Sequence, residues 1–308
     1  MQARRYPKLH IQSKNELAKH LSHSKLLKEE TLGLINDVLK NFNAYWRDNQ
    51  NRSEPKKEKY VRSAKGTPLG RLLDNINKRV LAPHDDLLPN FIFGGIRDMN
   101  HVKAAKYLLG KKRRRTCLKL DITRFFEQIN EERVFHFFCD KCACSKKAAV
   151  LLRNFCCVPK GPKGSASKCK TIARGFATSS RLAVWCNLDT FIKLDRFVKK
   201  NLRGKDPRIA IYVDDIGITA SRVSKEEMEK LSFELENLLL NADRSQRLPI
   251  NKNKTKISSH EEGIEHLGVR LYRNRLSIDA KTKSKIDKAQ NSDERKSLIR
   301  YKKYVEKI

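Results

Sequence analysis

The chain has 308 residues and carries 67 Lys and Arg against 35 Asp and Glu, a formal net charge of +32. Since 39% of its residues are hydrophobic, it can bury a sizeable core, which excludes wholesale disorder. No apolar run is long enough to cross a bilayer, and the first residues lack the apolar segment of a secretory signal, so we expect a soluble, cytoplasmic protein. An excess of positive charge spread along the whole chain favours nucleic acid as partner, over a merely solubilising surface or attraction to anionic lipid.

The first part of the chain is predicted to be mainly helical. Leu, Ile and Phe recur at helical spacing from about residue 14 to residue 50. Residues 49–59 are polar and contain a Pro, which is typical of a linker or a surface loop. Residues 68–81 predict an amphipathic helix, and another helix is predicted over about 100–109. The apolar segment 116–122 is predicted to be a strand.

Five of the eight cysteines fall in a segment that also carries an apolar stripe at helical spacing. Cys139, Cys142 and Cys144, followed by Cys156 and Cys157, are spaced in a way that suggests zinc ligands. No second C-x-x-C pair and no H-x-H pair completes a closed site. The pattern therefore favours small buried thiols in a reducing compartment, with zinc binding as the alternative.

The second half of the chain alternates between strands and helices. A helix is predicted over 180–201, a β-branched strand region over 208–220, and a helix over 224–242 that opens with a Ser cap and an acidic first turn. The next segments are predicted to be short strands, and they cover 250–257, 264–274 and 275–280. The basic tail is predicted to be one helix or a helix pair. This order predicts a mixed α/β fold with an antiparallel element.

Three carboxylates stand where a folded chain would otherwise place apolar residues. Asp121 follows an apolar strand, and Asp214 and Asp215 interrupt another. Burying carboxylates costs several kcal/mol each unless cations or hydrogen-bond donors compensate. Lys or Arg could compensate, but carboxylates from adjacent strands also suit Mg²⁺, and two such ions stabilise the attacking and leaving oxygens of phosphoryl transfer. Asp-Asp-Ile-Gly between strands is also ordinary hairpin chemistry, but together with Asp121 it favours metal catalysis.

The motifs around these carboxylates resemble those of reverse transcriptases of the bacterial retron and defence-associated group. YVDD at 212–215 resembles their motif C, and LKLDITRFFEQI at 118–129 resembles motif A. The segment 173–195 resembles motif B, INKNKTKI at 250–257 motif D, and EHLGV at 265–269 the primer-gripping motif E. Their order and spacing agree along most of the chain from about residue 60 onward.

The resemblance implies roles for the residues of motifs A and C. Asp121, Asp214 and Asp215 would be the catalytic carboxylates, and together with the backbone carbonyl of Ile122 they would hold two Mg²⁺ ions, with Mn²⁺ as the alternative metal. Phe126 matches the aromatic residue that lies beneath the sugar and rejects a 2′-hydroxyl, so we expect a preference for deoxynucleotides. Plain core packing is the alternative role of Phe126.

The resemblance also implies a set of nucleotide-binding residues. Gly175 would let the backbone approach the nascent base pair, Lys254 would protonate the leaving pyrophosphate, and Lys59 and Arg62 would hold the triphosphate. For these two and Lys254, a solvated surface position is the alternative. Arg174 stands where the family usually carries Gln before the motif B glycine; because it cannot repeat the contacts of Gln, we expect altered nucleotide positioning or narrow activity.

Two further departures concern the group within the family. Ser179-Ser180 replaces the usual Ser-Pro after motif B, and His266-Leu267-Gly268 replaces the Val-Thr-Gly signature typical of retron enzymes. The second departure shifts weight from a true retron enzyme toward the related defence-associated or abortive-infection enzymes.

The resemblance implies a right-hand polymerase fold of the α/β (α+β) class, whose palm is an antiparallel sheet with flanking helices. The expected divisions are a helical N-terminal segment (1–55), fingers (56–115), a palm (116–272) with a helical fingers insertion at about 131–172, and a short helical thumb (273–308).

The implied function is RNA-directed DNA synthesis on a dedicated structured noncoding RNA, in bacterial antiphage defence. The expected partners are that RNA as template and as primer, dNTPs, the DNA product, and an effector protein or a second copy of the chain, with no membrane. The alternatives are template-independent or protein-primed DNA synthesis by the same site, a non-catalytic RNA-binding scaffold, and a basic assembly protein.

Overall fold

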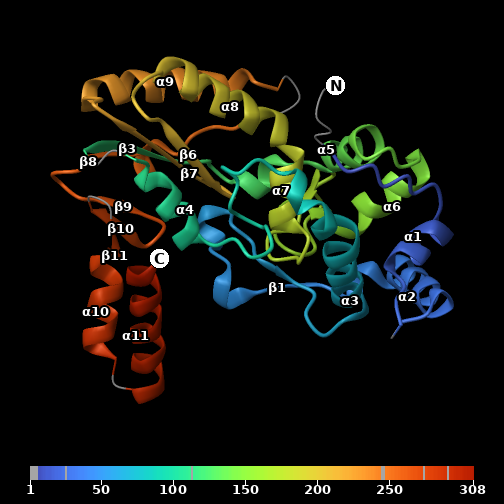
Figure 1. Ribbon diagram of the computed structural model, residues 1–308. Helices are drawn as coiled ribbons and strands as arrows, with labels where there is room; N and C mark the ends of the chain where they lie inside the picture. Colours follow the sequence, from blue (N-terminus) through green and yellow to red (C-terminus); the bar gives the residue numbers. More distant parts are fainter. Residues whose placement is uncertain (1–5, 25, 112–113, 244–246, 273–274, 290) are drawn as a thin grey trace. The chain divides into compact units, whose positions relative to one another are not determined.

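The computed structural model describes residues 6–24, 26–111, 114–243, 247–272, 275–289 and 291–308 (Figure 1). The chain forms two compact units, each built from two separate stretches of sequence. The helical unit comprises Met1–Pro89 and Arg124–Leu188, and the sheet unit comprises Asn90–Thr123 and Asp189–Ile308. These units do not follow the expected borders of fingers, palm and thumb, and those borders stay predictions.

The helical unit consists of short helices and two small antiparallel pairs of strands. Its α-helices are α1 (Lys14–Leu21), α2 (Lys28–Asn41), α3 (Pro68–Asn75), α5 (Glu131–His136), α6 (Lys146–Cys156) and α7 (Ser179–Cys186). Its strands are β1 (Arg47–Asp48), β2 (Arg62–Ser63), β4 (Cys157–Pro159) and β5 (Lys170–Ile172), with β1 paired to β2 and β4 to β5. Its π-helical turns are η4 (Ile76–Leu81) and η7 (Phe137–Lys141), and its 3₁₀ turns are η1 (Phe42–Ala44), η2 (Gln50–Arg52), η3 (Pro55–Lys57), η5 (Ala82–Leu87) and η6 (Phe125–Gln128).

Polar caps explain where several of these helices begin. The side chains of Ser13, Asn130 and Ser145 each accept a hydrogen bond from a backbone N–H of the first turn of α1, α5 and α6. Beyond its cap, α6 buries an apolar face that includes Leu152 and Phe155. Caps and apolar periodicity together fix these helices.

The predicted helical regions are present but are divided more finely than the apolar spacing suggests. The run over 14–50 is divided into α1, α2 and η1, and the amphipathic segment 68–81 changes from α3 to a π-helical turn at Ile76. The predicted helix over 180–201 is interrupted at Asn187, whose side chain turns back to donate to the carbonyl of Ala183 at 2.8 Å. Local hydrogen bonding of this kind competes with the helix, although the apolar spacing continues across the break.

The centre of the sheet unit is an antiparallel sheet with the strand order β6-β7-β3-β8. The strands are β3 (Arg115–Asp121), β6 (Arg208–Tyr212), β7 (Asp215–Ser221) and β8 (Lys256–Ser259). Of the predicted strand 250–257 only the last residues belong to β8, because η8 (Lys252–Lys254) precedes it as a 3₁₀ turn. Central strand β3 is almost entirely buried: of its seven residues only Lys119 is half-buried, and the apolar residues Cys117, Leu118 and Leu120 occupy its middle.

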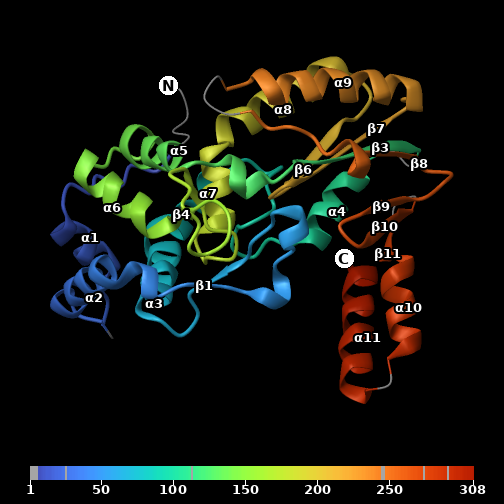
Figure 2. The ribbon, with the colours of Figure 1, turned by 180° about the vertical axis from the view of Figure 1, so that it is seen from behind.

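Helices cover both faces of this sheet (Figures 1 and 2). On one face lie α8 (Leu188–Asn201) and α9 (Lys225–Asn241), and on the other lies α4 (His101–Leu109). α9 begins at a capping box formed by Ser224 and Glu227 and buries Met228, Leu231, Leu235 and Leu239. Each fully buried leucine stabilises the packing by about 1.5–3 kcal/mol.

A second sheet of the same unit, with the order β11-β10-β9, carries the C-terminal helices. It consists of β9 (Ile264–His266), β10 (Val269–Tyr272) and β11 (Arg275–Ile278), and α10 (Ala280–Lys288) and α11 (Ser292–Lys307) follow it. Tyr301 and Tyr304 of α11 bond to His101 and Asn100 at the start of α4, each at 2.8 Å. The tail is therefore a helix pair whose second helix is anchored to α4.

The predicted α/β fold with an antiparallel sheet and flanking helices is confirmed. Within the described ranges of the chain, no helix is both long enough and apolar enough to traverse a lipid bilayer.

Candidate active site

The three candidate carboxylates come from the paired ends of β3 and β7 and from the turn beside them. Asp121, the last residue of β3, is the partner of Asp215, the first residue of β7. Asp214 belongs to the turn between β6 and β7, and its carbonyl accepts a hydrogen bond of 3.1 Å from the N–H of Ile122. The sheet register thus brings together Asp121, Ile122, Asp214 and Asp215, as the motif spacing predicts.

The turn has a strained backbone at Val213, and Gly94 packs closely against it. Val213 has a φ of 61°, which is rare for a β-branched residue. Gly94 lies against it: a Cβ at Gly94 would collide with the backbone of Tyr212 and Val213. The preceding Phe93 donates to the carbonyl of Ile211 at 2.8 Å. Gly94 was not predicted to belong to the site. The feature of the sequence that could have indicated it is the pair Gly94-Gly95, which follows the apolar segment 91–93.

Two lysines pair with the carboxylates. Lys254 Nζ lies 2.9 Å from Asp121 Oδ1, and Lys119 Nζ lies 3.4 Å from Asp215 Oδ1. Burial raises the pKa of Asp215, an effect that Lys119 opposes and Asp121 reinforces. The hydrogen bond to Asp121 raises the pKa of Lys254. The predicted Lys254 therefore does lie at the carboxylates, and Lys119 is a second cation that sequence reasoning missed.

The chemistry of the donors suits a hard divalent cation, since carboxylate and carbonyl oxygens are the ligands that Mg²⁺ prefers. Among the residues that the structure describes, no three His, Cys, Asp or Glu side chains are grouped closely enough to hold a metal ion. The lysines instead supply positive charge at Asp121 and Asp215.

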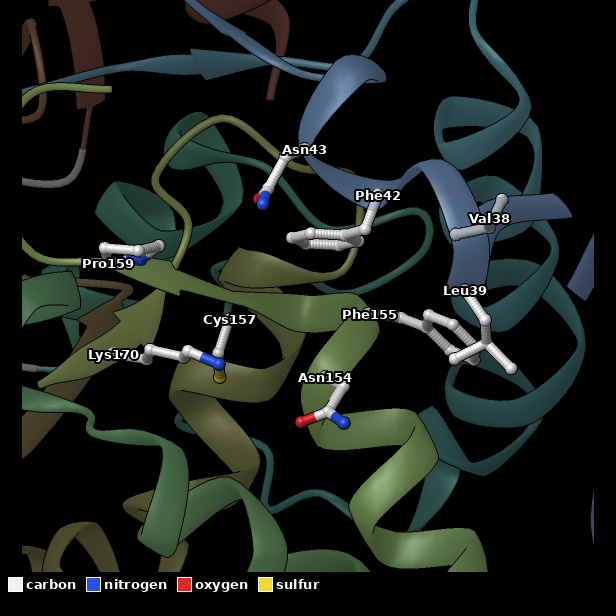
Figure 3. A pocket seen from close by; sticks show the side chains of 9 residues that line it. All are labelled: Val38, Leu39, Phe42, Asn43, Asn154, Phe155, Cys157, Pro159 and Lys170. Carbon is white, nitrogen blue, oxygen red and sulfur yellow. The ribbon is translucent and has the colours of Figure 1, made fainter. Parts of the chain in front are cut away.

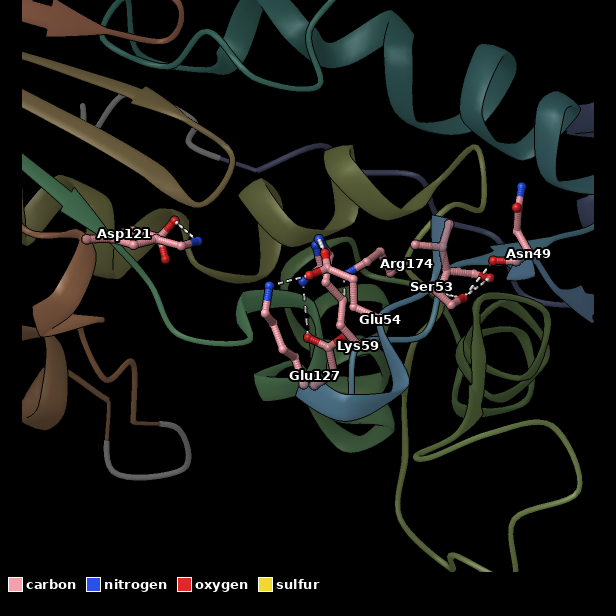
Figure 4. Close-up of polar contacts among 10 residues, drawn as sticks. Asn49, Ser53, Glu54, Lys59, Asp121, Glu127 and Arg174 are labelled. Carbon is pink, nitrogen blue, oxygen red and sulfur yellow. Dashed lines mark hydrogen bonds and ion pairs between the residues drawn. The ribbon is translucent and has the colours of Figure 1, made fainter. Parts of the chain in front are cut away.

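The helical unit holds Phe126, the residue expected beneath the nucleotide sugar, and Arg174, which was expected to alter nucleotide positioning. Phe126 lies in η6 and is only 7% exposed, with its ring edge-on to that of Phe125 at 5.9 Å between centroids. The Arg174 guanidinium lies over the Phe126 ring, 4.6 Å from its centroid. Two of its nitrogens reach Glu127, each 3.3 Å from a carboxylate oxygen (Figure 4). Motif B thus contacts motif A through Arg174.

Gly175 has a backbone conformation that favours glycine, and it lies so close to the backbone of Arg62 that a side chain would not fit. Its φ is 101°, and a Cβ there would collide with the carbonyl of Arg62. Next to it, the N–H of Arg62 donates to the carbonyl of Arg174 at 2.6 Å. In this structure Gly175 therefore admits strand β2; its approach to a base pair stays a prediction.

Arg62 and Lys59 already have acidic partners. Arg62 is 4% exposed, forms an ion pair with Asp48 and donates to the carbonyl of Gly161. Its guanidinium lies 5.3 Å from the ring centroids of both Trp46 and Tyr60. Burial lowers its pKa, which Asp48 opposes.

Lys59 lies 2.7 Å from Glu54, and hydrogen bonds from Lys57 and Lys59 lower the pKa of Glu54 to about 2 (Figure 4). The hollow lined by Arg62, Glu127 and Arg174 holds only about 20 Å³, roughly one water molecule. The structure thus places Lys59 and Arg62 in ion pairs rather than at an open phosphate site.

A larger hollow of about 270 Å³ lies on the other face of the β4–β5 pair (Figure 3). Cys157 and Lys170 line this hollow, Val158, Thr171 and Ile172 line the small one, and Pro159 lines both. The other walls are aliphatic, aromatic and amide side chains from α2, η1 and α6, namely Val38, Leu39, Phe42, Asn43, Asn154 and Phe155.

The cysteines of the helical unit are mostly buried. Burial raises the pKa of Cys144 to about 11 and those of Cys156 and Cys186 to about 12, so these groups stay protonated thiols at neutral pH. Burial also raises the pKa of the Cys142 and Cys157 thiols.

Comparison with known proteins agrees with the motifs. The family model described as reverse transcriptase (RNA-dependent DNA polymerase) matches residues 55–271. The Retron Ec48 reverse transcriptase of Escherichia coli is 29% identical over 216 residues, covering 66% of this chain and 47% of that protein. The chain therefore spans about half the length of this curated relative, and the resemblance to retron enzymes is confirmed.

Among solved structures, a telomerase from Candida albicans in complex with a fragment of telomeric RNA is similar with a TM-score of 0.43 and 12% identity, over 69% of this chain and 39% of that one. This likeness is too weak to say anything about function. The family match alone spans well over half of the sequence. The chain belongs to the reverse transcriptase family.

Proposed function

We propose that this protein is an RNA-directed DNA polymerase that joins deoxynucleotides to a growing 3′ end. The observation that carries the proposal is the pairing of Asp121 with Asp215 across β3 and β7, with Asp214 in the adjoining turn. It lies within the part of the chain that matches the reverse transcriptase family.

In this proposal Asp121, Asp214, Asp215 and the carbonyl of Ile122 would hold two Mg²⁺ ions, with Mn²⁺ as the alternative. Because no three such side chains are grouped around one point among the described residues, the three carboxylates would have to turn toward the ions as these bind. Bound divalent ions would lower the barrier by stabilising charge on the attacking and leaving oxygens. Lys254 and Lys119 neutralise Asp121 and Asp215 in the structure, and bound metal ions would take over that role. Lys254 is 61% exposed, so it can leave Asp121 at little cost and protonate the pyrophosphate.

The remaining site residues take part in nucleotide selection and binding. In the proposal, Phe126 lies beneath the sugar and Gly175 borders the nascent base pair. Lys59 and Arg62 hold the triphosphate, for which they exchange Glu54 and Asp48 for phosphate oxygens. Since the Arg62 side chain is buried, this exchange requires it to leave Asp48 and adopt another rotamer, while the backbone of β2 stays in place.

The template in this proposal is a structured noncoding RNA, and the biological role is bacterial antiphage defence in the cytoplasm. The similarity to a retron reverse transcriptase and the net charge of +32 support it. The basic helices α10 and α11 offer cations for RNA phosphates. An effector protein or a second copy of the chain completes the proposed set of partners.

The test uses the protein purified with its co-purifying RNA, incubated with Mg²⁺ and labelled dNTPs. Asp214→Asn is compared with Asp98→Asn, a matched control whose side chain is 84% exposed. We expect DNA complementary to the bound RNA from the wild type and the control, and none from Asp214→Asn. Equal synthesis by all three proteins would refute the proposed site.

Other outcomes identify the alternatives. Labelled DNA that matches no RNA in the preparation would indicate template-independent or protein-primed synthesis. No DNA from any variant, with RNA still bound, would indicate a non-catalytic scaffold.

A further inference from the structure

Arg174 is in direct contact with the proposed sugar-selecting residue, Phe126. Its guanidinium carbon lies 4.6 Å from the centroid of the Phe126 ring, within the range of a cation–π contact. In addition, Phe125 meets the same ring edge-on. The Phe126 ring thus has an aromatic neighbour and a cationic neighbour, both within the helical unit.

The guanidinium is itself held in place. Glu127 accepts from Arg174 Nε and Nη2 at 3.3 Å each, the two-pronged arrangement in which a planar guanidinium keeps its orientation. The side chains of Arg174 and Glu127 are 18% and 12% exposed, so this pair is shielded from water. Lysine or glutamine could not provide both the fork toward Glu127 and a flat face toward the ring.

The backbone of Arg174 is fixed as well. Its carbonyl accepts from the N–H of Arg62 in β2, and the closely packed Gly175 follows it. The guanidinium therefore projects from a backbone that cannot shift easily. Because Phe126 and Glu127 are neighbours in the chain, the Arg174 side chain can lie over the Phe126 ring and pair with Glu127 at the same time.

We propose that Arg174 is a positioning residue that holds the Phe126 ring and so sets how strongly the enzyme prefers deoxyribonucleotides to ribonucleotides. The inference rests on the proposed polymerase function and on Phe126 as the residue beneath the sugar. An aromatic ring excludes a 2′-hydroxyl only as long as it cannot move aside. Arg174 and Glu127 prevent that movement, because displacing the ring breaks the stacking contact.

Direct binding of the triphosphate by Arg174 predicts a different result. A phosphate-binding arginine contributes equally to both kinds of nucleotide, so its loss raises KM for dNTPs and rNTPs alike. If Arg174 instead acts through Phe126, its loss changes the ratio of kcat/KM for dNTP to kcat/KM for rNTP. In a Phe126→Ala background, where the ring is absent, the loss of Arg174 then leaves that ratio unchanged.

The experiment measures this ratio for the wild type, Arg174→Met, Arg174→Lys, Arg174→Gln and Glu127→Gln in the purified full chain with its RNA. Arg153→Met is the matched control, because Arg153 lies in the same unit and pairs with Glu131, at 3.5 Å, outside the proposed site. We expect the ratio to fall about tenfold in Arg174→Met, which corresponds to about 1.4 kcal/mol. Arg174→Lys, Arg174→Gln and Glu127→Gln should lower it by about threefold to tenfold, and Arg153→Met should leave it unchanged.

A double-mutant cycle tests the route of the effect. Phe126→Ala alone should lower the ratio, and adding Arg174→Met should lower it no further. Because the ratio compares two nucleotides on the same folded enzyme, partial unfolding of a variant reduces both rates and leaves the ratio as it was.

An active wild type whose ratio is unaffected by all four Arg174 and Glu127 variants would overturn the inference alone. Additive effects of Phe126→Ala and Arg174→Met would also overturn it. A wild type that incorporates neither nucleotide would overturn the proposed function and the inference with it.

Discussion

The imidazole of His266 lies directly against Gly217. A Cβ at Gly217 would be 2.7 Å from His266 Nε2 and 2.7 Å from a methyl carbon of Leu108. Gly217 stands two residues after Asp215 in β7, and His266 ends β9. The second sheet therefore packs onto the sheet of β3, β6, β7 and β8 through a histidine, at a strand position with no side chain to obstruct it.

Gly217→Ala is expected to lower the free energy of unfolding by about 1–3 kcal/mol, because the added methyl group overpacks this contact. Urea unfolding measures the change. Gly33→Ala is the control: Gly33 lies in α2, and a Cβ added there would have nothing within 4 Å, so alanine should be neutral or stabilising. Equal stability of Gly217→Ala and the wild type would contradict the packing described here.

His266 makes stability depend on pH. It is 1% exposed, neither ring nitrogen has a hydrogen-bond partner among the described residues, and burial lowers its pKa to about 3. The folded protein thus holds the neutral ring, whereas the unfolded chain binds a proton near pH 6.5. The stability contributed by the neutral ring is complete above pH 6.5 and is lost as the pH falls toward 3.

The measurement is the free energy of unfolding at several pH values for the wild type and His266→Phe. We expect the wild type to lose more stability than His266→Phe between pH 6.5 and pH 4. Parallel curves would show that His266 is not the group responsible.

Lys254 allows activity to be separated from stability. Lys254→Met should lower kcat about 100-fold if the lysine protonates pyrophosphate. Since its side chain is 61% exposed, loss of the pair with Asp121 should change the free energy of unfolding by less than about 1 kcal/mol. Lys256→Met, an exposed lysine at the start of β8, is the control for charge. If both variants slow synthesis equally, the role assigned to Lys254 is wrong.

In contrast to the exposed pair of Lys254 and Asp121, the buried pair of Arg62 and Asp48 should contribute strongly to stability. Asp48→Ala leaves a guanidinium with 4% exposure without its carboxylate, which should cost about 3 kcal/mol of stability. Asp293→Asn, whose side chain is 90% exposed and lies 3.9 Å from Lys296, should leave stability unchanged. Thermal unfolding of the two variants compares them, and a similar Tm for both would mean that the buried pair contributes little.

The sequence allowed the strands that carry the carboxylates to be predicted, since the apolar run before Asp121 and the β-branched run around Asp214 and Asp215 are local signals. The capped helix α9 could be predicted for the same reason, because its Ser and Glu caps lie beside the apolar repeat.

Contacts between distant residues could not be predicted in this way. From the sequence, Arg62 was expected to bind the triphosphate. In the structure its partners are Asp48 and the carbonyl of Gly161, and no local sequence pattern indicates these contacts. The same holds for Arg174, whose departure from the family pattern was visible although its contact with Phe126 was not. Lys254 was expected in a strand, and the 3₁₀ turn that places it near Asp121 has no periodic signal.

The division of each unit into two separate stretches affects how the chain is made. Strand β3 leaves the ribosome well before its partners β7 and β8, which follow about 100 residues or more later. The helical unit can be completed once Leu188 has been synthesised, while β3 still has both edges unpaired and its apolar side chains uncovered. Residues 115–121 are thus the segment where we expect a chaperone to bind the nascent chain.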